Sequence, residues 1–210
     1  MSIQVFWYGH SCFALEADGS RLVLDPFADG SVPGLPALRL TANAVLCSHE
    51  HGDHHGTEGV TLASAGNGPF LVEKIPSFHD AQQGRLRGRN TIHRITCQGM
   101  SIVHLGDLGH VLSEESAQKL SEPDLLMIPV GGHYTIDAAE AARVVEQLHP
   151  RVIIPMHYRR GGVGYDVIET VGPFLSHFGI WKKVSNPFVL EKETHAQIAV
   201  MEPYLLETGF

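Results

Sequence analysis

The segment Ala44–His55 has the sequence AVLCSHEHGDHH and joins a short apolar stretch directly to four histidines and two acidic residues. Within it, the pattern H-x-H-x-D-H runs from His49 to His54. Imidazole nitrogens and carboxylate oxygens bind Zn²⁺, Mn²⁺ or Fe at about 2.0–2.2 Å. Residues two apart in an extended segment project to the same side, so His49 and His51 can bind one ion. If the chain turns into a helix at Gly52, then Asp53 and His54 point elsewhere and can bind a second ion.

Four ligands in one short segment cannot complete two metal sites, so further ligands must come from distant parts of the chain. We expect them where other predicted strands end, because strand ends can meet at one edge of a sheet. The candidates are His79, Asp107 and His157. A carboxylate such as Asp107 can bridge two cations, and each cation then keeps an open position for water. The resulting assignment is His49, His51 and His79 on the first metal, Asp53, His54 and His157 on the second, and Asp107 between them.

The third ligand of the first metal has alternatives. His93 and His104 are rivals to His79 for this position. His104 precedes Asp107 by three residues, so simple strand alternation places these two side chains on opposite faces. We therefore expect His104 to lie in the core or behind the ligands.

Length and composition predict a single globular domain spanning residues 1–210. Apolar residues make up 43% of the chain and charged residues 18%, which is typical of globular proteins and argues against disorder. The formal net charge of −8 disfavours broad binding to nucleic acid or anionic membranes, so we expect neither as a partner. Histidine occurs 14 times, and it is both the commonest metal ligand and a frequent acid–base group.

Cysteine usage and the N-terminal sequence predict a soluble, cytoplasmic protein. The three cysteines, Cys12, Cys47 and Cys97, are too few for a disulfide framework and are expected to be reduced. The N-terminus lacks the pattern of a signal peptide, and no apolar run approaches the roughly 18 residues that span a membrane. Trp181 and Phe210 are candidates for a contact between copies of the chain, so a homo-oligomer stays open.

The first half of the chain predicts mainly β-strands. Apolar and β-branched runs predict strands over Ile3–Tyr8, Cys12–Glu16, Arg21–Leu24, Ala44–Cys47, Phe70–Ile75, Thr91–Cys97 and Ser101–Leu105. Asp18 and Gly19 mark a hairpin turn. The segment Phe27–Thr41 is rich in Gly, Pro and Ala and predicts a surface loop.

The second half alternates strands with helices. Strands are expected over Asp124–Val130 and Val152–Pro155, and residues 187–201 are expected to form a last strand pair. Helices are expected over Ser113–Leu120, Thr135–Leu148 and Tyr165–His177, the last interrupted near Gly172. Strands mixed with helices on both sides predict an α/β protein built as a layered sandwich.

The segments that carry these residues resemble the metallo-β-lactamase superfamily. SHEHGDHHG, HLGDLGH and IPMHY occur in this order, as they do in its binuclear metallohydrolases. WYGHS, LVLDPF, RGRNTI and IPVGGHYTID sharpen the resemblance to the branch of Zn-dependent hydrolases of the β-lactamase fold. Ascorbate-6-phosphate lactonase and N-acyl-phosphatidylethanolamine phospholipase D are more distant members of the superfamily. The resemblance covers nearly the whole chain.

This resemblance implies a four-layer αβ/βα sandwich with the metal site at its top edge, and it implies the ligand assignment given above. It also implies that Asp25, in the LVLDPF segment, lies beneath the metal site and accepts hydrogen bonds that orient the ligands. The implied cofactors are two divalent metal ions. Zn²⁺ is expected, and His and Asp ligands also suit Mn²⁺, Fe²⁺ or Ni²⁺.

We expect a hydrolase in which a metal-bound hydroxide attacks an ester, lactone or phosphodiester bond of a small anionic substrate. Asp107 and Asp53 are the expected catalytic carboxylates, with Asp107 positioning the hydroxide. His10, His133 or a water molecule would protonate the leaving group. Arginines follow two proposed ligands, at residues 85–89 and 159–160, and guanidinium groups bind phosphate and carboxylate, which favours an anionic substrate.

Two other classes of function stay open. A mononuclear iron redox enzyme can use the same scaffold, and oxygen consumption would reveal it. A non-catalytic metal-binding module is the second class, although open coordination positions argue against it.

Overall fold

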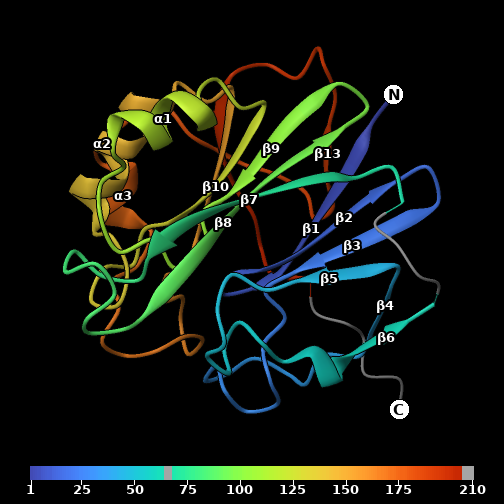
Figure 1. The fold of residues 1–210 in the computed structure, drawn as a ribbon, viewed down its shortest axis with the longest axis horizontal. Helices are drawn as coiled ribbons and strands as arrows, with labels where there is room; N and C mark the ends of the chain where they lie inside the picture. Colours follow the sequence, from blue (N-terminus) through green and yellow to red (C-terminus); the bar gives the residue numbers. More distant parts are fainter. Residues whose placement is uncertain (64–67, 205–210) are drawn as a thin grey trace.

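The computed structural model describes residues 1–63 and 68–204, which form two large β-sheets with α-helices gathered beside one of them (Figure 1). The first sheet has five strands in the order β13-β1-β2-β3-β5. They are β1 (Ile3–Gly9), β2 (Cys12–Ala17), β3 (Ser20–Leu24), β5 (Ala44–Leu46) and β13 (Phe188–Leu190).

The second sheet has seven strands in the order β12-β14-β11-β10-β9-β8-β7. They are β7 (Leu71–Phe78), β8 (Arg89–Cys97), β9 (Met100–His104), β10 (Leu125–Pro129), β11 (Val152–Met156), β12 (Lys182–Lys183) and β14 (Gln197–Val200). The strands β9, β10, β11 and β14 run parallel, and β10 and β11 are buried along their whole length, as strands covered on both faces are. The helices α1 (Glu114–Leu120), α2 (Ala138–Leu148) and α3 (Gly172–Leu175) lie together on one side of this sheet (Figure 1).

Two apolar clusters hold these layers together. Strand alternation in β1 sends Val5 and Trp7 into a large cluster that joins both sheets and the helices, and it sends Phe6 and Tyr8 into a smaller one. The smaller cluster is covered by apolar residues of the 27–42 segment and by the short elements β4 (Leu40–Ala42), η1 (Thr57–Gly59) and β6 (Val60–Leu62). The predicted layered α/β architecture is confirmed. In the described part of the chain, the layer that covers the smaller cluster contains no α-helix and is built mostly from irregular chain.

Local sequence signals account for several of these elements. The predicted hairpin turn is present: Asp18 and Gly19 both have positive φ, 49° and 72°, as the tight turn between β2 and β3 requires. Helix α2 begins at Ala138 and not at Thr135, because the Asp137 side chain accepts a hydrogen bond from the Glu140 backbone N–H and completes a capping box.

The prediction of a helix over Tyr165–His177 was wrong for most of its length. Only α3, Gly172–Leu175, is helical. The preceding chain instead crosses to the segment near residues 31–34, where Gly164 N donates to Pro33 O at 2.8 Å and the Tyr165 hydroxyl donates to Ser31 O at 2.7 Å. These long-range hydrogen bonds compete with the hydrogen bonds of a helix. The residue pattern of the segment gave no sign of them.

The prediction of a last strand pair in residues 187–201 was also partly wrong. Both strands exist, but they do not pair with each other. β13 pairs antiparallel with β1 in the first sheet, whereas β14 pairs parallel with β11 in the second. The C-terminal part of the chain therefore links the two sheets.

Backbone hydrogen bonds tie the ends of strands from the two sheets together. His157 N, after β11, donates to His10 O, after β1, at 3.2 Å. Thr91 N in β8 donates to Ser48 O, after β5, at 2.9 Å. The segments that carry the predicted metal ligands are thus fixed against each other across the two sheets.

Within residues 1–63 and 68–204, no helix has the length and apolar character needed to cross a membrane. Trp181 is 47% exposed, and Phe210 lies outside the described residues. The three cysteines are free, with Cys12 and Cys97 buried.

Replacing Asp137 with Ala should lower the free energy of unfolding by about 1 kcal/mol, because the first turn of α2 loses its capping acceptor. Urea denaturation followed by circular dichroism measures this change. Glu146→Ala, an exposed position in the same helix, is the matched control and should change stability by less than about 0.5 kcal/mol. Equal stability of Asp137→Ala and the unmodified protein would show that the cap contributes nothing.

Candidate metal centre

The predicted metal ligands, together with the predicted proton donor His10, follow the ends of strands from both sheets. The residues that follow directly or closely are His10 after β1, His49 after β5, His79 after β7, Asp107 after β9 and His157 after β11. Asp53 and His54 continue from His49 through a tight turn, in which His54 N donates to His51 O at 2.9 Å. Short connections at one end of the sandwich therefore bring together residues that are up to 147 positions apart in sequence, the separation of His10 (position 10) and His157 (position 157).

A first ligand group contains His49, His51 and His79, the three histidines predicted for the first metal. One ring nitrogen from each lies within 4.8 Å of the others. His79 is held in place by the chain after β9, because Gly109 N donates to Phe78 O at 3.0 Å. A Cβ atom at Gly109 would lie 2.3 Å from the carbonyl carbon of His79, so only glycine allows this approach.

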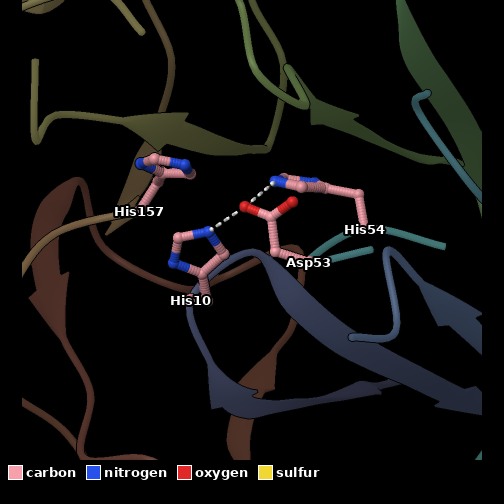
Figure 2. A group of neighbouring side chains, drawn as sticks. All are labelled: His10, Asp53, His54 and His157. Atoms are coloured by element: carbon pink, nitrogen blue, oxygen red, sulfur yellow. Dashed lines mark hydrogen bonds and ion pairs between the residues drawn. The ribbon is translucent and has the colours of Figure 1, made fainter. Parts of the chain in front are cut away.

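A second ligand group contains His10, Asp53, His54 and His157 (Figure 2). Three of these were predicted for the second metal, and His10 is an addition, since the sequence suggested it only as a proton donor. The His10 ring is buried, and its Nε2 lies 3.1 Å from Asp53 Oδ2. Its ring centroid lies 4.0 Å from that of His157. His10 is thus placed to hold the Asp53 carboxylate, and while Nε2 donates to Asp53 only Nδ1 is free.

Asp107 lies between the two ligand groups. Its Oδ1 is 3.0 Å from His54 Nε2, and its Oδ2 is 3.3 Å from His157 Nε2, so it contacts the second group. The same Oδ2 is 3.1 Å from His79 Nε2 in the first group. One carboxylate therefore reaches both groups, as the bridging role predicted for Asp107 requires.

The buried donors of this centre fit divalent cations. Among the described residues, His49 Nε2, His54 Nε2, Asp107 Oδ1 and both ring nitrogens of His157 are buried without a hydrogen-bond partner. Each such buried polar atom costs about 1–3 kcal/mol when nothing satisfies it. The Nε2 atoms of His49, His54, His79 and His157 lie 3.0–3.9 Å from the Asp107 oxygens without hydrogen-bond alignment, as expected when several lone pairs converge on a shared ion. Nitrogen and oxygen donors without cysteine suit zinc and other first-row divalent metals.

The electrostatics of the cluster keep the carboxylates charged. Burial would raise the pKa of Asp107, but the adjacent His157 and His54 outweigh burial and hold it well below its usual range. Burial likewise opposes ionisation of Asp53, and the hydrogen bond from His10 with the nearby His54 lowers its pKa. Burial, reinforced by neighbouring histidines, lowers the pKa of His49 to about 3, so this ring is neutral at pH 7. The ionised carboxylates and the neutral His49 ring are in the forms that bind metals, whereas Asp107 and Asp25 raise the pKa of His54 despite its burial, so a metal that binds there displaces a proton.

Asp25 is fully buried and orients one histidine of each group. Its Oδ2 accepts a hydrogen bond from His54 Nδ1 at 2.7 Å, which leaves Nε2 facing Asp107. It also accepts from the Ser48 hydroxyl at 2.7 Å, and that hydroxyl lies 2.9 Å from His49 Nδ1. The structure thus places Asp25 behind the ligands, as the resemblance implied. The sequence analysis did not predict that Ser48 links Asp25 to His49. The one feature of the sequence that points to this role is the position of Ser48 directly before His49.

Three histidines that the sequence left open lie outside both ligand groups. His93 and His104 are buried in β8 and β9, where they face each other in the sheet register. His104 Nε2 lies 3.0 Å from Ser11 O, so it belongs to the core. His133 is exposed and packs edge-on against Tyr134, with ring centroids 4.5 Å apart. Within the described ranges, His79 therefore completes the first group, and His133 lines neither of the two cavities beside the cluster.

A cavity of about 260 Å³ opens directly above the ligands. His51, His79, Asp53 and Asp107 form its floor, and Arg87, Tyr134 and Tyr165 complete its lining. Burial, with the nearby Asp53 carboxylate, raises the pKa of Tyr165, so its hydroxyl stays protonated. Tyr165 was missed at the site, since its segment was predicted to be helical.

The Asp107 turn depends on Asn90, which lies in the RGRNTI segment. The buried Asn90 Oδ1 accepts from Asp107 N at 3.0 Å, and Nδ2 donates to Leu105 O at 2.9 Å. Asn90 therefore fixes the backbone on which Asp107 is carried.

Comparison with known proteins identifies similar chains. The family model described as "Beta-lactamase superfamily domain" matches residues 4–157. A putative Zn-dependent hydrolase of the metallo-beta-lactamase superfamily from Thermotoga maritima has a similar structure, with a TM-score of 0.74 and 32% identity, over 95% of this chain and 98% of that one. A UPF0173 metal-dependent hydrolase from Thermococcus onnurineus is 30% identical over 74% of this chain and 84% of its own. Igni18, a metallo hydrolase from Ignicoccus hospitalis, shares the fold, with a TM-score of 0.67 and 21% identity, over 97% and 96% of the two chains.

Protein purified without a metal-affinity tag should contain about two metal ions per chain, because two ligand groups share one carboxylate. His157→Ala removes a ligand from the second group only, and its content should fall towards one. Elemental analysis measures both values. The exposed His195→Ala is the matched control and should retain the full content. A single ion that survives loss of His157 would contradict the two-site interpretation.

Asp25→Asn should weaken metal binding by about 10–100-fold, because the amide no longer offers the carboxylate that orients His54 and, through Ser48, His49. Competition with a chromophoric chelator measures the dissociation constant. Asp18→Asn is the control, since Asn tolerates the left-handed turn position that Asp18 occupies. An unchanged constant in Asp25→Asn would remove Asp25 from the metal centre.

Proposed function

The chain belongs to the beta-lactamase superfamily, and from this membership we propose that it is a metal-dependent hydrolase with a binuclear His/Asp centre. The position of Asp107 is the observation that carries the proposal. Its carboxylate lies within 3.3 Å of His54 and His157 on one side and of His79 on the other. A mononuclear iron centre needs no carboxylate shared between two ligand groups, so this geometry favours the hydrolase over the redox alternative.

Two bound divalent cations would lower the pKa of a water towards about 7 and polarise the substrate oxygen under attack. The protein supplies the geometry for this chemistry. Asp25 orients a histidine of each ligand group, and His10 holds Asp53. Because Asp107 and Asp53 remain ionised, they carry negative charge where two cations would otherwise repel each other.

The substrate is a small molecule with an ester, lactone or phosphodiester bond. The cavity of about 260 Å³ above the ligands accommodates a reacting group but no folded partner. Tyr134 lines the wall of this cavity, where a phenol hydroxyl can donate a hydrogen bond to a substrate oxygen, whereas the Tyr165 hydroxyl already donates to Ser31 O. Zn²⁺ is the proposed metal, and Mn²⁺, Fe²⁺ or Ni²⁺ fits the same donors.

Asp107→Asn should lower kcat/KM at least about a thousandfold, because the shared carboxylate is lost while the side chain keeps its size. The assay uses metal-loaded protein with a 4-nitrophenyl ester, a lactone and bis(4-nitrophenyl) phosphate. Circular dichroism checks that the variant is folded. Asp18→Asn, far along the chain in the β2–β3 turn, should keep full activity.

Two results would overturn the proposal. One is a wild-type rate in Asp107→Asn on a bond that the protein hydrolyses. The other is a protein that binds one iron, consumes oxygen and hydrolyses none of the three substrates, which would establish the redox class.

A further inference from the structure

A second cavity adjoins the one above the ligands. It has a volume of about 740 Å³ and is lined by residues 47–51, His55, residues 87–89 and Thr91. We call it the arginine cavity, because Arg87 and Arg89 line it. His51 and Arg87 also line the cavity above the ligands, so the two spaces meet at these side chains.

The backbone beside Arg87 is fixed by a buried carboxylate. Asp80, directly after the ligand His79, is only 3% exposed. Its two oxygens accept four backbone N–H bonds of 2.7–3.0 Å, from Gln82, Gly84, Leu86 and Arg87. A loop held by four bonds to one buried group presents the Arg87 side chain in a defined place next to the metal centre.

The guanidinium of Arg87 contacts the aromatic ring of Tyr134. The guanidinium carbon lies 5.6 Å from the centroid of the Tyr134 ring, a cation–π contact. Tyr134 itself lines the cavity above the ligands. This contact holds the guanidinium near the Tyr134 ring and does not use its N–H donors.

The arginines of this loop lack the partners that other arginines in the protein have. Within residues 1–63 and 68–204, no carboxylate lies within 4.0 Å of the guanidinium of Arg85, Arg87 or Arg89, and none of the three donates a side-chain hydrogen bond. The seven remaining arginines each pair with a carboxylate or a backbone carbonyl. Glu50 is an exposed acidic residue of the arginine cavity, and it makes no ion pair with Arg87 or Arg89.

We propose that Arg87, with Arg89, binds a non-scissile oxyanion of the substrate, a carboxylate or a phosphate, in the arginine cavity. This inference rests on the proposed hydrolase, because the bond to be broken then lies above Asp107. Arg87 is the specificity-determining residue, since it lines both cavities. A guanidinium offers paired N–H donors that match two oxygens of either anion. The substrate is therefore a small ester, lactone or phosphodiester with a second anionic group on the acid or alcohol part.

A matched pair of esters tests this specificity on metal-loaded protein. Mono-4-nitrophenyl glutarate carries a terminal carboxylate, and 4-nitrophenyl valerate has a chain of the same length without charge. Arg87→Gln should lower the ratio of kcat/KM for glutarate over valerate at least about tenfold. Arg85→Gln is the control, because Arg85 is exposed on the same loop and lines neither cavity. An unchanged ratio in Arg87→Gln, or an equal fall in Arg85→Gln, would overturn the proposal.

Anion binding gives a readout that does not depend on hydrolysis. Calorimetric titration of wild-type, Arg87→Gln and Arg85→Gln proteins of equal metal content uses inorganic phosphate in one arm and acetate in the other. The affinity of Arg87→Gln should be about tenfold lower than that of the wild type, and Arg85→Gln should be unchanged. The fall should be seen with phosphate if the native group is a phosphate, and with acetate if it is a carboxylate. Equal affinities in wild type and Arg87→Gln for both anions, or no binding by wild type, would overturn the proposal. If neither ester is hydrolysed but anion binding still depends on Arg87, the anion site stands and the proposed hydrolase fails.

Discussion

The buried carboxylate of Asp25 is the interaction on which the centre depends. It bonds directly to His54 and, through the Ser48 hydroxyl, reaches His49, so it aligns one histidine from each ligand group. Its backbone N–H donates to Leu46 O at 2.9 Å, and its Oδ1 accepts from Ser48 N at 2.6 Å. The end of β3 is thereby joined to the end of β5. A charge buried this deeply is tolerated because the Ser48 backbone N–H, the Ser48 hydroxyl and His54 Nδ1 all donate hydrogen bonds to the carboxylate. The neighbouring His54 also helps to hold the pKa of Asp25 below the usual range despite burial.

The centre belongs to neither sheet alone. The first sheet supplies His10, Asp25 and the segment from His49 to His54, whereas the second supplies His79, Asp107 and His157. Their alignment therefore depends on the apolar cluster that packs the two sheets together. This arrangement explains why core residues such as Trp7 serve the site without contacting a ligand: the indole Nε1 donates to His10 O at 3.0 Å and fixes the turn that carries the His10 ring.

Several residues of the site have strained backbone conformations. His10, Asp25 and His157 have φ values of 51°, 44° and 53°, in the left-handed region that side chains with a Cβ rarely adopt. Each lies just after a strand, where the chain must turn sharply to point the side chain into the cluster. Strain of this kind costs on the order of 1 kcal/mol per residue and persists where the surrounding structure enforces it. The hydrogen bonds of Trp7 and Ser48 and the backbone bond between His157 and His10 are the contacts that enforce it here.

The sequence by itself determined the features that depend on near neighbours. The alternation of strands, the Asp18–Gly19 turn, the buried character of β10 and β11, and the spacing from His49 to His54 all follow from residues a few positions apart. Other contacts between residues far apart in the sequence were decided only by the tertiary structure. It brought His10 to Asp53, divided β13 and β14 between the two sheets, and turned the segment before α3 into a crossing that carries Tyr165 to the cavity. The physical reason is that long-range strand pairing and packing select among local conformations of similar energy, and this selection leaves no periodic pattern in the chain.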